Sequence, residues 1–385
     1  MKLALGQINP TIGDCAGNAR LVLEAAHKAA AAGAEILVLP ELTLTGYPPQ
    51  DLLDLPAFHL EIQSALQTVA AQAPLTTLVG FAETNPSRVG KPFFNSAALI
   101  RQGKVEAVYR KQLLPYYGVF DDNRYFESGQ QPCVFEQGGV RFGITICEDI
   151  WNQEAFNPRL YAKDPLADLA EQNCAWVLNL SASPFELGKP AKRLALGKHI
   201  AKKYGFGLAL CNQASAVDDL IFDGGSFAID SRGEVLARAV CFESAVCVSD
   251  LKQPSAPAQW PESESAWLAD ALALGIRDYA RKNGASRVCL GLSGGVDSSV
   301  VAALAVRALG PQAVHGVLLP TRFTSAASNE DALALAKALG VKAEIFNLDP
   351  LFEEAKRTLA AGGSVEGLVA ENIQPRLRMA VLMAV

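Results

Sequence analysis

Short β-rich runs alternate with longer stretches of helical spacing through the first two-thirds of the chain. The strands predicted in this way are 3–8, 36–40, 76–82, 96–100, 140–147, 176–181 and 207–212. Helical spacing over 18–32 and 192–204 separates some of these runs. Strands followed by helices predict an α/β fold built of packed layers.

The pattern changes at two later points. Residues 222–250 hold three closely spaced strands with Gly-Gly and Arg-Gly turns, which predicts an antiparallel meander. Mixed sheets with antiparallel parts are common in large α/β folds. Residues 252–264 then place three prolines among small and polar residues. This composition is typical of a linker.

Alternation of helices and strands restarts beyond the linker. Helices are predicted at 265–283, 297–309 and 329–339, and strands at 288–292, 314–319 and 343–348. This order predicts a doubly wound parallel α/β unit. The chain stops inside an apolar helical run at 379–385, so we expect this second domain to be partial. The predicted domains are therefore 1–250, a linker at 251–264, and 265–385.

Composition limits the class of protein. Half of the residues are hydrophobic and 19% are charged, so large cores can be buried. The net charge of −6 disfavours nucleic acid and anionic membranes as partners. The sequence holds no 18-residue apolar run and no Cys-x-x-Cys pair among its eight cysteines. A cytoplasmic protein that binds neither nucleic acid nor membrane is expected.

Three reactive side chains follow predicted strands of the first domain. Glu41 follows 36–40, Lys111 follows 105–109, and Cys147 ends 140–147. A carboxylate can take the proton of a thiol, and an ammonium can stabilise the oxyanion that forms when a thiolate attacks an acyl carbon. Each residue alone is more typical of a packed core or a solvated loop. Together they are the three kinds of group that thiol-based acyl chemistry needs.

The ordered motifs Pro-Glu-Leu, Tyr-Arg-Lys and Cys-Glu-Asp-Ile-Trp resemble the nitrilase, or carbon–nitrogen hydrolase, superfamily. The resemblance covers about residues 1–250. It implies a four-layer α-β-β-α sandwich in which Glu41 is the base, Lys111 stabilises the oxyanion and Cys147 is the nucleophile that forms a thioester.

Three further segments, which begin at Thr45, Leu114 and Asn179, resemble the glutaminase domain of the glutamine-dependent NAD synthetase family. By this resemblance, Tyr117, Ser183 and Lys189 hold the substrate glutamine. Many superfamily members carry a further Glu after the lysine loop, where this chain has Asp121 and Asp122. Whether one of these aspartates orients Lys111 stays open at this point.

The segment 288–300 reads Val-Cys-Leu-Gly-Leu-Ser-Gly-Gly-Val-Asp-Ser-Ser-Val. Its glycines permit a tight turn between a strand and a helix, whose free N–H groups bind phosphate. The absence of Gly-Lys-Ser/Thr excludes a Walker P-loop. The segment resembles the pyrophosphate loop of the N-type ATP pyrophosphatases. The implied ATP-binding residues are Gly291, Leu292, Ser293, Gly294, Gly295, Val296, Asp297, Ser298 and Ser299, with Asp297 also a candidate Mg²⁺ ligand.

Two later segments, which begin at Leu319 and Glu371, resemble the NAD synthetase family among these pyrophosphatases. Asn372 is the implied contact to deamido-NAD. The resemblance implies a homo-oligomeric enzyme that hydrolyses glutamine and uses ATP to convert deamido-NAD to NAD. Two alternatives remain: a nitrilase-type amidase fused to another adenylating amidoligase, and a non-catalytic binding or assembly module.

Overall fold

Two six-stranded sheets of mixed strand direction and one two-stranded sheet are built by the described strands of the first 250 residues. The computed structural model describes residues 1–87, 89–158 and 160–385. The first sheet has the order β14-β1-β2-β3-β4-β5 (Ala245–Asp250, Lys2–Gln7, Ile36–Val38, Thr76–Thr84, Phe93–Arg101, Lys104–Arg110). The second has the order β13-β12-β9-β8-β7-β6 (Val235–Arg238, Phe227–Ile229, Gly207–Asn212, Trp176–Ser181, Val140–Ile146, Val134–Gln137).

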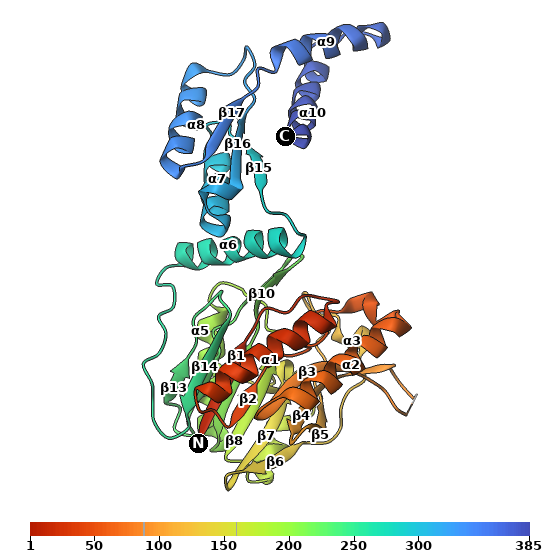
Figure 1. Ribbon diagram of the computed structural model, residues 1–385, viewed down its shortest axis with the longest axis vertical. Helices are drawn as coiled ribbons and strands as arrows, with labels where there is room; N and C mark the ends of the chain where they lie inside the picture. The colour runs from red at the N-terminus through yellow and green to blue at the C-terminus, as the bar shows by residue number, and fades with distance from the viewer. Residues whose placement is uncertain (88, 159) are drawn as a thin grey trace. The chain divides into compact units, whose positions relative to one another are not determined.

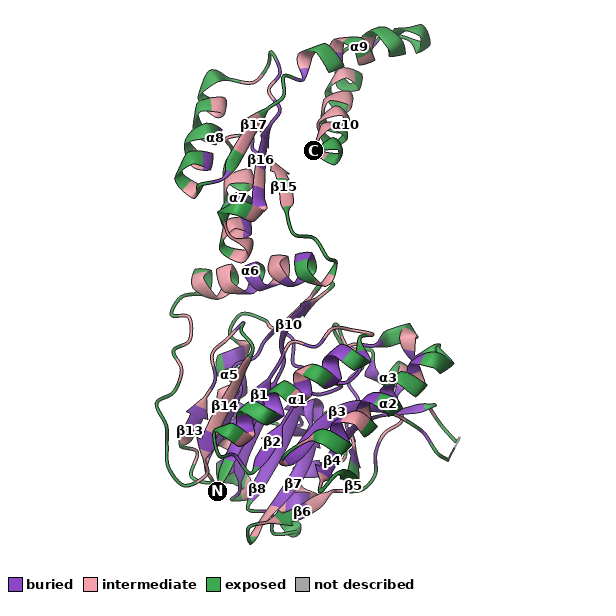
Figure 2. Cartoon of the chain, viewed as in Figure 1, coloured by how far each residue is buried: buried purple, intermediate pink, exposed green. Residues whose placement is uncertain are grey.

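Side chains on alternate positions of one strand enter different cores, because successive residues point to opposite faces of a sheet. On β1, Leu3 and Leu5 pack between the two sheets, whereas Ala4 packs against α1 (Cys15–Ala31) and α2 (Pro56–Gln72). A third core lies between the second sheet and the helices α4 (Pro165–Glu171) and α5 (Lys189–Tyr204). The strands are therefore buried and the helices cover them (Figures 1 and 2). These three cores separate four layers, which confirms the predicted α-β-β-α sandwich.

Two predicted helices begin at other residues in the structure, because residues at the start of each helix determine where it begins. Strands β8 and β9 occupy the predicted residues, whereas α1 and α5 both begin three residues earlier than predicted. The carboxylate of Asp14 accepts a hydrogen bond from the backbone N–H of Gly17 at 2.8 Å and so caps α1. Pro190 stands in the first turn of α5, where its fixed φ suits a helix.

The meander predicted at 222–250 is wrong as a single unit. Only β12 and β13 form an antiparallel hairpin there. Strand β11 (Leu220–Asp223) pairs with β10 (Ala214–Val217), and β14 pairs with β1 in the other sheet. Turn residues indicate where a strand ends. Which strand it pairs with depends on contacts throughout the sheet.

The chain divides into two compact units, Met1–Ala271 and Leu272–Val385. Helix α6 (Glu264–Lys282) contains the division. Residues 255–260, part of the predicted linker, lie along β13: the backbone N–H of Ser255 donates to Leu236 and that of Ala258 to Arg238. The indole of Trp260 donates to the carbonyl of Ala239. This segment is therefore anchored to the first unit.

A three-layer arrangement of parallel strands and helices forms the second unit. Its sheet has the order β15-β16-β17 (Val288–Gly291, Val314–Leu318, Lys342–Ile345), with all strands parallel. Leu318 of β16 packs with α7 (Val296–Leu309) and α8 (Ala326–Leu339), whereas Val317 packs on the other face with α10 (Leu368–Ala384). Helices on both faces confirm the predicted doubly wound unit.

Among the described residues, none of the helices combines the length and apolarity needed to cross a membrane.

Candidate active site

Cys147 lies at a sharp turn between a buried strand and a short helix. Strand β7 ends at Ile146, and Cys147 opens the 3₁₀ helix Cys147–Ile150 with a φ of +39°. Residues other than glycine rarely adopt a positive φ, and such backbone positions gather at functional sites. Cys147 is 5% exposed and lines a cavity of about 240 Å³. The turn thus aims the thiol from the sheet edge into this cavity.

A buried ion network of two carboxylates and one ammonium lies close to Cys147. Nζ of Lys111 is 2.6 Å from Oε1 of Glu41 and 2.6 Å from Oδ2 of Asp122. All three side chains are buried. Lys111 follows β5, Glu41 stands three residues after β2, and Asp122 begins the short helix α3 (Asp122–Tyr125). The structure therefore places Glu41 and Lys111 together near Cys147, and it places Asp122, of the two aspartates, beside Lys111.

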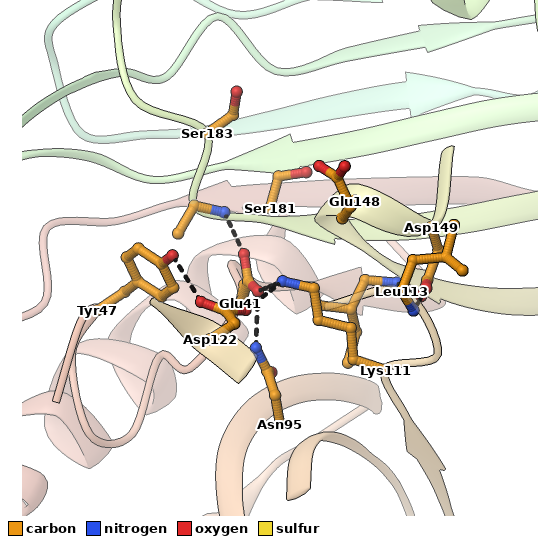
Figure 3. Close-up of polar contacts among 12 residues, drawn as sticks. Glu41, Tyr47, Asn95, Lys111, Leu113, Asp122, Glu148, Asp149, Ser181 and Ser183 are labelled. Atoms are coloured by element: carbon orange, nitrogen blue, oxygen red, sulfur yellow. Dashed lines mark hydrogen bonds and ion pairs between the residues drawn. The ribbon is translucent and has the colours of Figure 1, made fainter. Parts of the chain in front are cut away.

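Neutral donors complete the hydrogen bonding of the two carboxylates (Figure 3). Glu41 accepts a bond from the side-chain amide of Asn95 at 2.7 Å and another from the backbone N–H of Ala182 at 3.0 Å. The hydroxyl of Tyr47 donates to Asp122 at 3.0 Å. These bonds hold both carboxylates in fixed orientations around the ammonium of Lys111.

The electrostatics of this network define what the thiol and the ammonium can do. Burial alone would lower the pKa of Lys111, but Asp122 and Glu41 outweigh it and raise that pKa well above its ordinary value. Burial raises the pKa of the Cys147 thiol well above its ordinary value, and Glu41 adds to this rise while Lys111 opposes it. The resting nucleophile is thus a neutral thiol next to a permanent cation. Attack on an acyl carbon then requires a base that takes its proton.

Asp149 connects the nucleophile turn to the lysine loop. Its Oδ1 accepts from the backbone N–H groups of Gln112 and Leu113 at 3.1 and 2.9 Å. Its Oδ2 accepts from the backbone N–H of Ile146 and the hydroxyl of Tyr109, both at 2.8 Å. Burial raises the pKa of Asp149 to about 6, although the hydrogen bonds from Ile146, Leu113 and Tyr109 oppose the rise. One carboxylate therefore fixes the residues on either side of both Lys111 and Cys147.

The predicted glutamine-binding residues line the same cavity as Cys147. Tyr117, Ser183 and Lys189 contribute to its wall together with Glu148. Tyr117 stands in the loop after Lys111, Ser183 follows β8, and Lys189 is the first residue of α5. Three separate elements thus converge on one cavity.

The predicted pyrophosphate loop of the second unit has the conformation expected of a tight strand-to-helix turn. Strand β15 ends at Gly291, Gly294 has a φ of +79°, and α7 begins at Val296. The hydroxyls of Ser293 and Ser298 lie 3.0 Å apart. Asp297 lies in the first turn of α7. The predicted residues 291–299 therefore form one continuous turn around a helix N-terminus.

Asn372 lies exposed on α10. Within the part of the chain that the structure describes, neither a hydrogen bond nor an ion pair joins it to residues 291–299. The same part shows no cluster of three or more His, Cys, Asp or Glu side chains that could hold a metal ion.

Several site residues were missed by sequence reasoning. Glu148 and Asp149 stand in the motif Cys-Glu-Asp that identified Cys147, and Tyr47 stands in a segment that carried the resemblance. The sequence therefore placed these three residues in recognised motifs, but it did not indicate their contacts. Asn95 lies inside β4 and carried no signal at all.

Both units match families of known proteins. The model of the carbon–nitrogen hydrolase family matches residues 2–259, and that of the NAD synthase family matches residues 268–385. The amidase of the nitrilase superfamily from Nesterenkonia AN1, solved as a Cys-to-Ala mutant, has a TM-score of 0.56 at 25% identity, covering 70% of this chain and 93% of that one. The fold and site thus define an enzyme that joins a carbon–nitrogen hydrolase domain to an NAD synthase domain.

Curated relatives carry both domains under one description. The glutamine-dependent NAD(+) synthetases of Synechocystis and Thermotoga maritima are 42% and 36% identical to the whole chain, which covers 71% and 72% of their lengths. The structure of the Acinetobacter baumannii glutamine-dependent NAD+ synthetase, solved with ADP, has a TM-score of 0.91 at 34% identity, covering 100% of this chain and 72% of that one. This chain belongs to the glutamine-dependent NAD(+) synthetase family of carbon–nitrogen ligases. The assignment supports this activity over the amidase–ligase fusion and the non-catalytic module.

Proposed function

We propose that residues 1–250 hydrolyse glutamine to glutamate and ammonia, and that residues 265–385 carry the ATP-dependent conversion of deamido-NAD to NAD. The observation that carries the first half is the buried Glu41–Lys111–Asp122 network near a neutral Cys147 thiol. A thiol, a carboxylate base and a fixed cation are the three groups that thiol-based amide hydrolysis needs.

The hydrolytic cycle uses Glu41 as the proton carrier. Glu41 takes the proton of Cys147 as the sulfur attacks the side-chain carbonyl carbon of glutamine. Lys111 stabilises the oxyanion, and Glu41 returns the proton to the leaving nitrogen so that ammonia departs and a thioester remains. Glu41 then deprotonates a water molecule, which attacks the thioester and releases glutamate and the free thiol. Tyr117, Ser183 and Lys189 hold the substrate in the cavity.

The second half uses ATP to activate a carboxylate. Residues Gly291 to Ser299 hold ATP, because the N–H groups and the dipole at the start of α7 favour phosphate. The nicotinate carboxylate of deamido-NAD, held at Asn372, attacks the α-phosphate and releases pyrophosphate. Ammonia then displaces AMP and forms the amide of NAD. Ammonia must arrive unprotonated, so transfer between the sites away from bulk water is part of the proposal.

Asp297 is the residue proposed to hold Mg²⁺ in this half. Mg²⁺ in nucleotide sites is commonly bound by one or two carboxylates together with the phosphates. A single carboxylate in the first turn of α7 fits that requirement, and no preformed cluster of protein ligands is needed. The cation would neutralise charge on the phosphates of ATP.

We further propose that the enzyme is a cytoplasmic homo-oligomer. Its eight cysteines are all free thiols, which agrees with a reducing compartment.

The direct test is release of glutamate from glutamine by the protein and by its Cys147→Ala variant. Release by the parent alone is the expected result. Equal release by both would refute the roles given to Glu41, Lys111 and Cys147. NAD formation from deamido-NAD, ATP and ammonium chloride tests the second half without the first.

A further inference from the structure

Asn95 contacts both members of the Glu41–Lys111 ion pair from the interior of β4. Its side-chain Nδ2 lies 2.7 Å from Oε1 of Glu41, and its backbone carbonyl accepts a hydrogen bond from the N–H of Lys111 at 2.8 Å. Asn95 is fully buried and is not among the described residues that line the cavity of Cys147. Figure 3 shows it on the opposite side of Glu41 from Ser183. Any effect of Asn95 on the reaction must therefore pass through the two residues that it holds.

Donors on both oxygens fix the orientation of the Glu41 carboxylate. Oε1 accepts from Nζ of Lys111 at 2.6 Å as well as from Asn95, and Oε2 accepts from the backbone N–H of Ala182 at 3.0 Å. Hydrogen bonds to an ionised carboxylate are stronger than those between neutral groups, and they favour its charged form. Without Asn95, the position of Oε1 would be set by the flexible side chain of Lys111 alone.

The side chain of Asn95 is oriented for Glu41 at the expense of its own hydrogen bonding. Its Oδ1 is buried and has no hydrogen-bond partner among the residues that the structure describes. The reverse orientation of the amide would bring this oxygen against Oε1 of Glu41, so that two acceptors would face each other. An unpaired buried acceptor costs free energy, and such a group in a native structure needs an explanation.

The other buried asparagines that the structure describes show that this arrangement is unusual in the molecule. Each of them donates through Nδ2 and accepts through Oδ1: Asn18, Asn85, Asn152, Asn179 and Asn212. An asparagine that served packing alone could be satisfied in the same way. The position of Asn95 instead supplies one neutral donor to the base.

We propose that Asn95 is a positioning residue of the hydrolytic site, which holds the Glu41 carboxylate in the orientation in which it exchanges protons with Cys147 and with the leaving nitrogen. The inference rests on the proposed glutaminase function. Asn95 acts on the proton transfers and leaves the binding of glutamine unchanged, because its side chain contacts the base and not the cavity.

The experiment compares kcat and KM for release of glutamate from glutamine. Asn95→Leu, which keeps the approximate volume and removes the donor, should lower kcat about 10- to 100-fold. KM should change by less than about threefold, because an interaction outside the cavity does not contribute to substrate binding. Alkylation of Cys147 by iodoacetamide should not slow, which verifies that the thiol and its cavity are intact.

Asn95→Asp separates the shape of this side chain from its hydrogen bond. The replacement has nearly the same shape, but a second carboxylate either repels Glu41 or shares a proton with it. Both results take away the free base, so kcat should fall at least as far as in Asn95→Leu. Retention of the parent kcat by Asn95→Asp would show that shape alone is required and would overturn the proposal.

Asn85→Leu is the matched control. Asn85 is also buried, and its side chain donates to the backbone carbonyls of Val89 and Lys91 in the connection between β3 and β4. Its loss should lower the melting temperature and change kcat by less than about threefold. An equal loss of kcat in Asn85→Leu and Asn95→Leu would assign the effect to general destabilisation. An unchanged kcat in Asn95→Leu, or slower alkylation in parallel with kcat, would equally contradict the role of Asn95. Failure of the proposed function is seen separately, as a parent protein that is alkylated at Cys147 but releases no glutamate.

Discussion

Nζ of Lys111 lies 2.6 Å from Oδ2 of Asp122, eleven residues further along the chain. Asp122 balances Glu41 on the other side of the ammonium, so Lys111 is held between two carboxylates. A lysine paired with Glu41 alone could neutralise the base that the reaction needs. The second carboxylate keeps Lys111 charged while Glu41 exchanges protons.

Asp122→Asn should lower kcat for glutamine hydrolysis about 10- to 100-fold, because Lys111 loses both an anchor and a charge partner. Steady-state release of glutamate measures the effect. Asp121→Asn is the matched control, since the side chain of Asp121 is 64% exposed and forms an ion pair with the exposed Arg124. Similar losses in both variants would contradict the special role of Asp122.

Glu41→Gln should slow glutamine hydrolysis without slowing the alkylation of Cys147. Without a base, glutamine hydrolysis should fall about 10²- to 10⁴-fold. Alkylation of Cys147 by iodoacetamide should be as fast as in the parent or faster, because the negative charge of Glu41 helps to raise the pKa of this thiol. Mass spectrometry of the labelled protein follows the rate. Glu24→Gln, which changes an exposed carboxylate of α1 outside the cavity of Cys147, should leave both reactions unchanged. Slower alkylation in Glu41→Gln would exclude this account.

Sequence reasoning predicted the features that local patterns encode, and it missed those that depend on contacts between residues far apart in the chain. Glu41, Lys111 and Cys147 were accessible because each follows a strand whose apolar run marks its end. The bond from Asn95 to Glu41 spans 54 residues and joins β4 to the loop after β2, so no local pattern encodes it. The pairing of β14 with β1 is equally remote, and the predicted meander failed for that reason. Helix α2 was not singled out, although Pro56 stands in its first turn.

Glu148 lines the proposed glutamine cavity, so the pH dependence of glutamine binding should follow its carboxylate. Burial raises the pKa of Glu148 to about 6, against the hydrogen bonds of Tyr117 and Tyr161 and the charge of Lys111, while Asp149 adds to the rise. The carboxylate is therefore charged at pH 7 and becomes neutral as the pH falls through about 6, whereas the α-ammonium of glutamine stays protonated. KM for glutamine should rise below pH 6.

Glutaramate, which is glutamine without the α-amino group, provides the reference for this pH profile. Asp149 also titrates near pH 6, but it acts on the catalytic geometry and so affects both substrates equally. The ratio of the two KM values should therefore isolate Glu148, and it should become independent of pH in Glu148→Gln. A ratio that still changes through pH 6 in that variant would assign the effect to another group.

Asp149→Asn should destabilise the first unit. Four donors converge on the two oxygens of Asp149, and an amide can accept from only two of them while its own N–H₂ faces the other two. Leaving buried donors unpaired should lower the free energy of unfolding by about 2–4 kcal/mol. Urea unfolding followed by circular dichroism measures this. Asp219→Asn, at an exposed position, should change it by less than about 0.5 kcal/mol.

Gly294→Ala tests the pyrophosphate loop. Gly294 has a φ of +79°, and a Cβ there would lie 2.2 Å from the backbone carbonyl oxygen of Ser328, so the loop must move to accept it. Gly310→Ala is the control, because its φ of +82° is also positive and so disfavours alanine, while a Cβ there would meet nothing within 4 Å. Gly294→Ala should abolish ATP-dependent NAD formation from ammonium chloride, while Gly310→Ala retains it and both variants still release glutamate from glutamine. Equal loss of NAD formation in the two variants would show that strain alone, and not the shape of the loop, accounts for the effect.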